Sequence, residues 1–152
     1  MAFDTLTQSS AWSFLHRSAI KSDQPVVLSS QSIHQQIPES FSNDSYGHVA
    51  WRTLISSSRT PSSELTVGLA ICSSGSGYLA HHRHKQAEVY YIVSGSGLVS
   101  INGKAHAVEK GAVIYIPSDA EHGIRCTSEE EHLQWIYCFA ANDFGDVKYR
   151  FS

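Results

Sequence analysis

The stretch YLAHHRHKQAEVYYIVSG, residues 78–95, decides the fold of this chain. Within it, His82, His84 and Glu88 form the pattern His-x-His, three residues, Glu, flanked by β-branched and aromatic residues that favour strands. Side chains alternate between the two faces of a strand, so His82 and His84 point the same way. Glu88 keeps that parity if a tight turn returns the chain. Three side chains that bind metals are therefore predicted to converge.

A fourth ligand is expected in GAVIYIPSDAEHGI, residues 111–124. Residues 113–116 are predicted to form a strand, Pro117 ends it, and a short turn delivers His122 to a position where a ligand can stand. Neutral imidazole nitrogens and a carboxylate suit one divalent transition metal ion, Fe²⁺, Mn²⁺, Ni²⁺ or Zn²⁺, and they also suit copper. The ligands do not choose between these metals, because affinity follows the Irving–Williams order and not biological use.

These two segments resemble the two motifs of the cupins, small β-barrels whose first motif has His-x-His, three or four residues, Glu, six residues and Gly. The matching residues stand in the expected order: His82, His84, Glu88 and Gly95 in the first motif, and Gly111, Pro117 and His122 in the second. Two ordered motifs are far more specific than His-x-His alone. The resemblance, which covers roughly the C-terminal two-thirds of the chain, implies an all-β, single-domain jelly-roll barrel (a double-stranded β-helix).

Three positions depart from the cupin pattern. Ser76 stands where a glycine is expected before the first motif, and Asp119 and Cys126 stand where the second motif usually has Gly and Asn. Each position affects a turn and not a ligand, and Asp tolerates left-handed conformations better than most residues. The alternative reading, that the four predicted ligands are core or rim residues of a cupin that has lost its metal, is disfavoured because the full set is intact.

Length and composition bound the class of protein. The 152 residues suffice for one domain with a full hydrophobic core but not for a two-barrel cupin. A net charge of -3 without a Lys/Arg cluster argues against nucleic acid or an anionic membrane as a partner. Because no apolar run resembles a signal peptide or a membrane span, we expect a cytoplasmic protein. Cys72, Cys126 and Cys138 lack Cys-x-x-Cys spacing and are expected to be free thiols.

The chain is predicted to divide into an N-terminal extension, residues 1–45, that wraps the barrel, and the cupin β-barrel, residues 46–152. The extension is expected to be helical or irregular, with residues 11–20 as a candidate helix and residues 25–28 as a candidate edge strand. In the barrel, Asn102-Gly103 predicts a type I′ hairpin turn, because both central positions of that turn need positive φ.

The C-terminal tail, residues 141–152, is expected to pack across the barrel or onto a partner subunit. A homodimer, through sheet edges or terminal segments, is implied by the resemblance and by the need to cover exposed strand edges. No internal repeat interrupts this organisation.

Alternation along the strands also predicts which side chains line the barrel. With His82 and His84 inward, Tyr78 faces the lumen as well; with Glu88 inward, so does Tyr90. The Tyr90 phenol would then lie near a substrate on the metal, and a divalent cation there would stabilise its ionised form, the phenolate. Tyr90 is therefore the candidate general base, with ordinary core packing as an equal alternative.

The candidate substrate-binding residues are aromatic. Tyr78 is expected to form a pocket wall, and Trp51, Trp135 and Tyr137 form an aromatic lining if they face inward. The opposite parity is open to each of their strands, so packing in the core or at an interface is an equal alternative.

A narrower resemblance concerns the activity. His-x-His, three residues, Glu, one residue, Tyr is similar to the pattern of small cupins that cleave dimethylsulfoniopropionate to dimethyl sulfide and acrylate. The resemblance implies that the metal holds the substrate carboxylate, that Tyr90 removes the proton from the adjacent carbon, and that the sulfide leaves by β-elimination. The segment Glu-Val-Tyr-Tyr is nevertheless common among cupins of many activities.

Two other functions stay open at this level. Three histidines and a glutamate also resemble the metal shell of quercetin-type cupin dioxygenases. A third hypothesis is a metal-dependent tailoring or ligand-binding cupin for a larger aromatic metabolite. A fold alone does not select a chemistry, so these alternatives stay open. We predict a metal-dependent enzyme for a small-molecule substrate, and the narrower resemblance places a lyase on a small carboxylate ahead of a dioxygenase or an isomerase.

Overall fold

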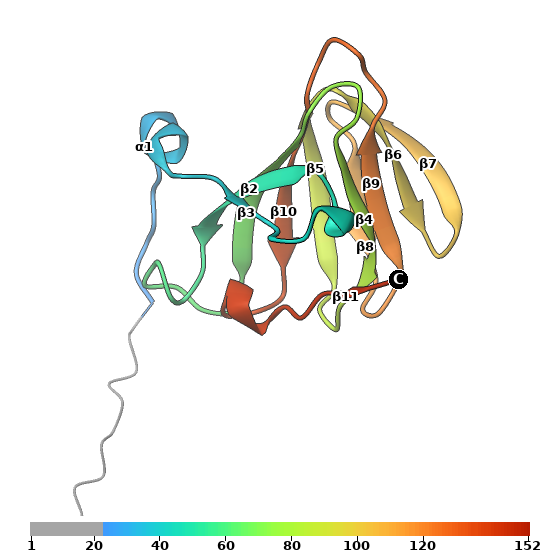
Figure 1. Cartoon of the computed structure of the whole chain (residues 1–152). Helices are drawn as coiled ribbons and strands as arrows, with labels where there is room; N and C mark the ends of the chain where they lie inside the picture. Colours follow the sequence, from blue (N-terminus) through green and yellow to red (C-terminus); the bar gives the residue numbers. More distant parts are fainter. Residues whose placement is uncertain (1–22) are drawn as a thin grey trace, which may run out of the picture.

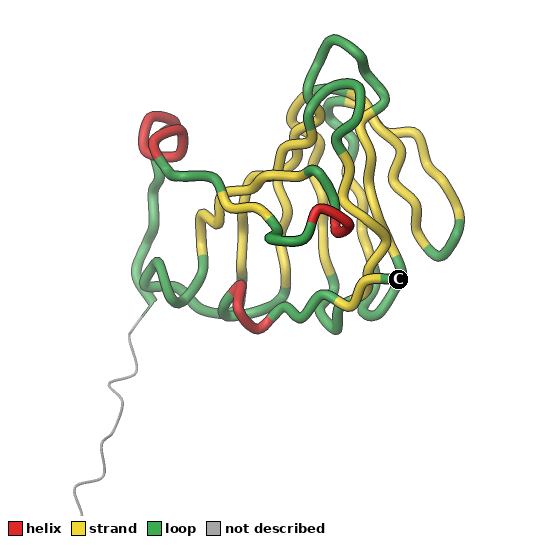
Figure 2. Tube along the Cα trace, viewed as in Figure 1, coloured by secondary structure: helices red, strands yellow, loops and turns green. Residues whose placement is uncertain are grey.

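The computed structural model describes residues 23–152, so the predicted helix at residues 11–20 lies outside the described residues. Two antiparallel sheets face each other and close into a barrel (Figures 1 and 2). The strand order is β1-β2-β3-β10-β5-β8 in the first sheet and β11-β4-β9-β6-β7 in the second. The predicted all-β jelly roll is therefore confirmed.

The elements follow one another with short connections. In chain order they are α1 (Ser30–Gln35), β1 (Glu39–Ser40), η1 (Asp44–Tyr46), β2 (Val49–Ile55), β3 (Thr66–Cys72), β4 (Tyr78–Arg83), β5 (Glu88–Ser94), β6 (Ser96–Ile101), β7 (Lys104–Glu109), β8 (Val113–Ile116), β9 (His122–Cys126), β10 (Leu133–Phe139), η2 (Phe144–Asp146) and β11 (Arg150–Phe151). No strand forms at residues 25–28, so the predicted edge strand there is wrong.

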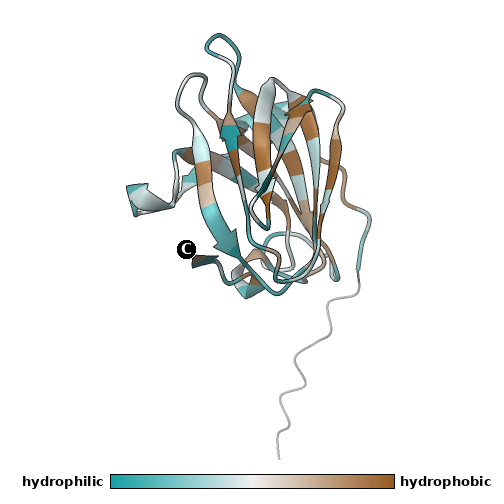
Figure 3. Ribbon diagram, turned by 90° about the vertical axis from the view of Figure 1, so that its right-hand side faces the viewer, coloured by the Kyte–Doolittle hydropathy of each residue, from teal (hydrophilic) through white to brown (hydrophobic). Residues whose placement is uncertain are grey.

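The core lies between the two sheets, because the strands alternate between buried and more accessible residues. In β10 the side chains of Leu133, Trp135, Tyr137 and Phe139 point inward and are buried. Figure 3 shows the same alternation as bands of hydrophobic and more hydrophilic residues along the strands. Since β10 pairs with both β3 and β5, its inward side chains lie at the centre of the first sheet.

Two turns take the backbone conformations that their residues predict. Asn102 and Gly103 have φ values of 48° and 78° and join β6 to β7, which confirms the predicted hairpin. Asp119 has φ 58° at the position where the cupin pattern usually has glycine. This departure from the pattern thus leaves the left-handed turn before β9 intact, because Asp tolerates that conformation.

An irregularity in β4 reverses one predicted orientation. The pairing of β4 with β9 shifts register between Leu79 and His82, so alternation from Tyr78 to His82 is interrupted. Tyr78 pairs with the exposed Arg125 and faces outward with it, whereas Leu79 is buried. The prediction that Tyr78 faces the lumen is therefore wrong, because a bulge adds one residue and changes the parity of those before it.

Segments that precede and follow the long barrel strands in the sequence meet over the open end of the barrel. Phe41 and Tyr46 precede β2, whereas Tyr149 and Phe151 come from the C-terminal tail. Tyr46 stacks on Phe151 with ring centroids 3.9 Å apart, and Phe41 contacts Tyr149 and Phe151 edge-on at 5.7 and 5.4 Å. We call these four residues the aromatic clasp. The tail thus packs across the barrel, where Figure 1 shows it reaching β4 through β11.

Two further features agree with the sequence, and a third observation concerns the helices. Cys72, Cys126 and Cys138 are free thiols. His81 and Arg83, which flank His82 with the opposite parity, are exposed. Within residues 23–152, no helix has the length and apolar character needed to cross a membrane.

Candidate metal centre and active site

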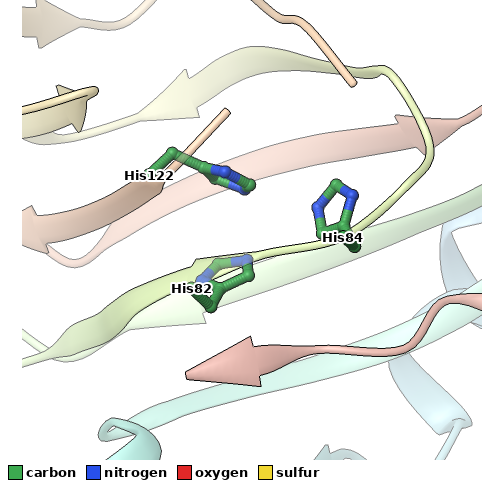
Figure 4. A group of neighbouring side chains, drawn as sticks. All are labelled: His82, His84 and His122. Atoms are coloured by element: carbon green, nitrogen blue, oxygen red, sulfur yellow. The ribbon is translucent and has the colours of Figure 1, made fainter. Parts of the chain in front are cut away.

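Three histidines meet inside the barrel near the open end. His82 lies on β4, His122 begins β9 and pairs with His82 across the sheet, and His84 follows β4 directly. Their ligand atoms all lie within 4.8 Å of one another, and Figure 4 shows the three rings turned toward a common point. The backbone of the His84 loop is tied to the turn before β9, because the Asp119 N–H donates to the His84 carbonyl at 2.9 Å.

Backbone hydrogen bonds orient each of these rings. The Nδ1 atom of each histidine lies 2.8 to 2.9 Å from the carbonyl oxygen of the residue two positions away: Ala80 for His82, Gln86 for His84 and Ala120 for His122. Since a carbonyl oxygen only accepts, each Nδ1 carries the hydrogen. In the neutral ring the Nε2 lone pair then points into the lumen, which is the arrangement that orients histidine ligands in metal sites.

Glu88 joins this cluster as the first residue of β5. Its Oε2 atom lies 3.3 Å from Nε2 of His84 and 3.2 Å from Nε2 of His122. All four side chains are at most 2% exposed. The carboxylate oxygen therefore faces nitrogen lone pairs at distances that leave no room for a water molecule between them. A cation bound between the four groups would remove this repulsion.

His82 supports the same interpretation. Its Nε2 atom is buried and has no hydrogen-bond partner among the described residues. Burial lowers the pKa of His82 to about 2, and the neighbouring His122 contributes in the same direction. The ring is thus neutral at pH 7, which is the form that binds a metal. Three imidazoles and one carboxylate, with one nitrogen lacking a partner, fit a transition metal ion.

An aromatic cavity adjoins the cluster. Its volume is about 20 Å³, and Glu88, Tyr90, Trp51, Trp135 and Tyr137 line it. This volume holds about one water molecule. The sequence-predicted pocket residues Trp51, Trp135 and Tyr137 therefore do come together beside the predicted ligands.

Tyr78 is placed elsewhere. It lines a shallower groove of about 420 Å³ on the outer face of the second sheet, together with His81 and Arg125. Its ring packs edge-on against His48, with centroids 5.3 Å apart. None of the four predicted ligands lines this groove. The larger hollow is therefore on the far side of the sheet from the metal-binding side chains.

Tyr90 lies where the alternation predicts it, facing the lumen and buried. Burial raises the pKa of Tyr90 well above its usual range, and the negative charge of Glu88 and a hydrogen bond to Glu88 act in the same direction. The ring centroid is 6.4 Å from that of His122 and 5.6 Å from that of Trp135. A hydroxyl group is thus placed beside the carboxylate of the metal-binding set.

The structure adds three aromatic cavity residues that the sequence did not single out: Phe41, Phe144 and Tyr149. Tyr149 stacks on His82 with centroids 4.6 Å apart, and burial, followed by the charge of Glu88, raises the pKa of Tyr149 well above its usual range. The one signal in the sequence is the number of aromatic residues in the tail, DFGDVKYRF. No spacing relates them to the histidines, because the contact depends on how the tail folds back.

The class is defined by the barrel, by the three converging histidines with Glu88 beside them, and by the match of residues 71–139 to the Cupin domain family: the chain belongs to the cupins. It is 38% identical over 119 residues to the dimethylsulfoniopropionate lyase DddW of Ruegeria pomeroyi. The aligned residues make up 78% of this chain and 76% of that protein.

Solved structures agree on the fold. A protein from Thermotoga maritima described as a predicted oxalate decarboxylase superposes with a TM-score of 0.64 and 25% identity, over 76% of this chain and 99% of its own. The polyketide cyclase RemF of Streptomyces resistomycificus gives 0.64 with 17% identity, over 78% of this chain and 81% of its own. A structure from a study of the dimethylsulfoniopropionate lyases RdDddP and RnDddQII gives 0.63 with 18% identity, over 76% and 61%. At such low identity the last two likenesses concern the fold alone.

Proposed function

We propose that the protein is a metal-dependent lyase that cleaves dimethylsulfoniopropionate, or a closely related small carboxylate, by β-elimination. The observation that carries the proposal is the buried Tyr90 beside a complete set of three histidines and a glutamate. The identity of 38% with a dimethylsulfoniopropionate lyase, over 78% of the chain, supports the same reaction.

In this proposal His82, His84, Glu88 and His122 hold one divalent transition metal ion. When bound, such an ion supplies a positive charge that attracts the substrate carboxylate and lowers the pKa of a nearby phenol. Tyr90, as phenolate, takes the proton from the carbon next to the carboxylate. The electron pair of that C–H bond forms the new C=C bond, the C–S bond breaks, and dimethyl sulfide leaves with the bonding pair, so that acrylate is the second product.

The aromatic walls suit the sulfonium end of this substrate. Trp51, Tyr137 and Tyr149 line one cavity, and a cation next to aromatic faces is stabilised by about 0.5 to 2 kcal/mol. The metal-binding side would receive the carboxylate, and the aromatic side the sulfonium. The two charged ends of a small zwitterion would thus have separate places once the cavity has opened.

Substrate entry requires the cavity to grow. A volume of about 20 Å³ is far below the several hundred Å³ of typical ligand sites. The aromatic clasp is the part of the wall that consists of segments with little backbone pairing, because β1 and β11 have two residues each. We therefore propose that the clasp opens to admit the substrate.

The second candidate is a cupin dioxygenase, because the same four donors would serve that chemistry. A small zwitterion is favoured because it requires the clasp to open less far than a flat aromatic substrate or a larger aromatic metabolite would. A direct test purifies the protein without added metal and reloads separate samples with Fe²⁺, Mn²⁺, Ni²⁺ or Zn²⁺. Each sample is assayed anaerobically for dimethyl sulfide and acrylate in equal amounts, and aerobically for oxygen uptake with a flavonol.

Equimolar dimethyl sulfide and acrylate without oxygen uptake are the expected result. Oxygen uptake with a flavonol and no acrylate would replace the lyase with the dioxygenase. Metal-loaded protein that does neither would contradict both enzyme proposals and favour a ligand-binding cupin.

A further inference from the structure

One hydrogen-bond donor at the aromatic cavity is buried without an acceptor. Trp51 lies in β2 and lines the cavity together with Glu88 and Tyr90. Its side chain is partly exposed, but its Nε1 atom is buried and has no hydrogen-bond partner among the described residues. A buried N–H group without an acceptor loses its bonds to water and gains none in return, so native proteins rarely retain one. The Trp51 N–H group therefore needs an explanation.

The other buried polar atoms without a partner are of a different kind. In residues 23–152 they are Oε1 of Gln36, Oε1 of Gln86 and Nε2 of His82, and all three are acceptors. His82 is accounted for by the metal centre, because its Nδ1 carries the hydrogen and its Nε2 is free to bind an ion. Neither glutamine lines the aromatic cavity. Trp51 is thus the single unpartnered donor of the four.

The side chains that pack on Trp51 offer no good acceptor for this N–H group. The rings of Phe41 and Phe144 lie against the indole, with centroids 4.8 and 5.9 Å from it. Ala70, which lies opposite Trp51 on β3, has only a methyl group. An aromatic face accepts an N–H hydrogen only weakly. A full-strength acceptor therefore has to come from a molecule that enters the cavity.

The charges around the cavity indicate which kind of acceptor fits. None of the residues that line it is lysine or arginine, and Glu88 is its one charged residue. The hydroxyl group of Tyr137 already lies 3.4 Å from Oγ1 of Thr53. A carboxylate that enters the cavity thus finds no side-chain cation and depends on the metal centre and on neutral donors. An N–H group that donates to a carboxylate forms a stronger hydrogen bond than one that donates to a neutral acceptor.

We propose that the Trp51 N–H group binds a carboxylate oxygen of the substrate and of the product acrylate, and thereby selects small carboxylates. The inference rests on the proposed lyase function and adds a specificity-determining residue to it. A carboxylate has two oxygen atoms, so one can face the metal centre while the other faces the indole. Because the N–H bond lies in the plane of the ring, the faces of the indole stay free for the sulfonium group.

NMR of the full chain loaded with Zn²⁺ observes the indole N–H group directly. The chain has three tryptophans, Trp12, Trp51 and Trp135, and the spectra of Trp12→Phe and Trp51→Phe assign the three indole resonances. The protein is titrated with acrylate and, separately, with trimethylsulfonium, which has the positive charge but no acceptor. We expect acrylate to move the Trp51 indole proton downfield and to slow its exchange with water, because it then donates to a charged acceptor. Trimethylsulfonium should do neither.

A second experiment removes the N–H group and keeps the ring. Trp51→benzothienylalanine has sulfur in place of N–H, and Trp51→5-fluorotryptophan is the matched control that keeps the donor. We expect the sulfur variant to bind acrylate about 10-fold more weakly and to have a KM for dimethylsulfoniopropionate raised about 10-fold, with kcat and metal content nearly unchanged. Its unfolding temperature without ligand should not fall, since an unpartnered donor has been removed. A purely structural role would lower that temperature and spare carboxylate binding.

The outcomes separate this inference from the proposed function. A protein that releases dimethyl sulfide but shows no change at the Trp51 indole with acrylate would overturn the inference and leave the lyase standing. A change at the Trp51 indole with acrylate, in a protein that releases no dimethyl sulfide, would contradict the lyase and support carboxylate binding by Trp51. Equal KM values of the two ring variants, the same change with trimethylsulfonium, or no binding of acrylate would each overturn the inference.

Discussion

The strands that hold the predicted ligands and the aromatic clasp that covers them enclose the same cavity, but they are held in different ways. β5 and β9 each pair with two neighbouring strands, whereas β4 pairs with β9 on one side and only with the two-residue β11 on the other, where Phe151 lies opposite His82. The clasp depends on ring contacts and on β1 and β11, which have two residues each. Local opening requires least free energy where few backbone hydrogen bonds and buried contacts are lost.

This difference assigns separate tasks to the two regions. The paired strands keep four donors in place, which a metal site requires. The clasp closes the cavity with aromatic surface, and its separation would remove the pairing of β11 with β4 but leave the pairs of β5 and β9 intact. The closed cavity can thus be too small for substrate and still enlarge at the clasp while the metal-binding side chains stay in place. If this is correct, substitutions in one region should have little effect on the other.

The largest effect is expected from removing ligands. Replacing both His84 and His122 by alanine leaves two of the four donors, so near-stoichiometric transition metal in the wild type should fall to background in the variant. Elemental analysis of protein purified without added metal measures this. The control is His81→Ala with His132→Ala, because both side chains are exposed. Equal metal content in all three proteins would contradict the proposed centre.

The next largest effect concerns Tyr90. Tyr90→Phe keeps the buried ring but removes the hydroxyl, so turnover should drop by about 10²- to 10⁴-fold while metal content is unchanged. Acrylate release and elemental analysis on the same samples separate the two quantities. Tyr115→Phe removes a hydroxyl from an exposed tyrosine and should be neutral. Substantial activity of Tyr90→Phe would show that another group takes the proton.

A smaller effect is expected in the clasp. Phe151→Ala removes the ring that stacks on Tyr46, an interaction of about 0.5 to 1.5 kcal/mol. Amide hydrogen exchange in residues 144–151 should therefore become about 3- to 10-fold faster, while exchange in β5 and β9, which do not pair with β11, stays the same. Leu65→Ala, at an exposed position away from the clasp, is the control. Equal acceleration in the barrel strands would mean that the two regions are not independent.

The smallest effect concerns the anchor of the tail. Asp143 accepts hydrogen bonds from Ser56 Oγ at 2.7 Å and from the N–H groups of Ser58 and Gly145 at 2.8 Å, and these bonds hold its pKa well below the usual range. A lowered folded-state pKa contributes stability that is present above the unfolded pKa of about 4 and is lost as the pH falls toward the folded pKa.

Asp143→Ala should therefore lower the free energy of unfolding by about 1 kcal/mol at pH 7, since the site is partly exposed to water. The difference from the wild type should shrink as the pH is lowered below about 4. Urea unfolding at several pH values measures it, with Asp44→Ala as the control. A difference that does not change with pH would assign the effect to something other than the Asp143 charge.

Local patterns in the sequence predicted the features that depend on near neighbours. The order of the motifs predicted the barrel, Asn102-Gly103 predicted the hairpin, and the spacing of Glu88 and Tyr90 predicted their shared orientation. The orientation of Tyr78 was predicted wrongly because the register shift in β4 arises from its pairing with β9. No residue of the segment indicates that shift.

By itself, the sequence determined the fold class and brought four candidate donors to one end of a barrel, because strand alternation and turn chemistry act over a few residues. Only the tertiary structure decided what covers them. Tyr149 is 67 positions from the His82 ring on which it stacks, and Trp51 and Glu88 line one cavity only when β3 and β10 lie between their strands. Such contacts follow from long-range packing, where many partners are equally apolar and the closure of the whole barrel selects among them.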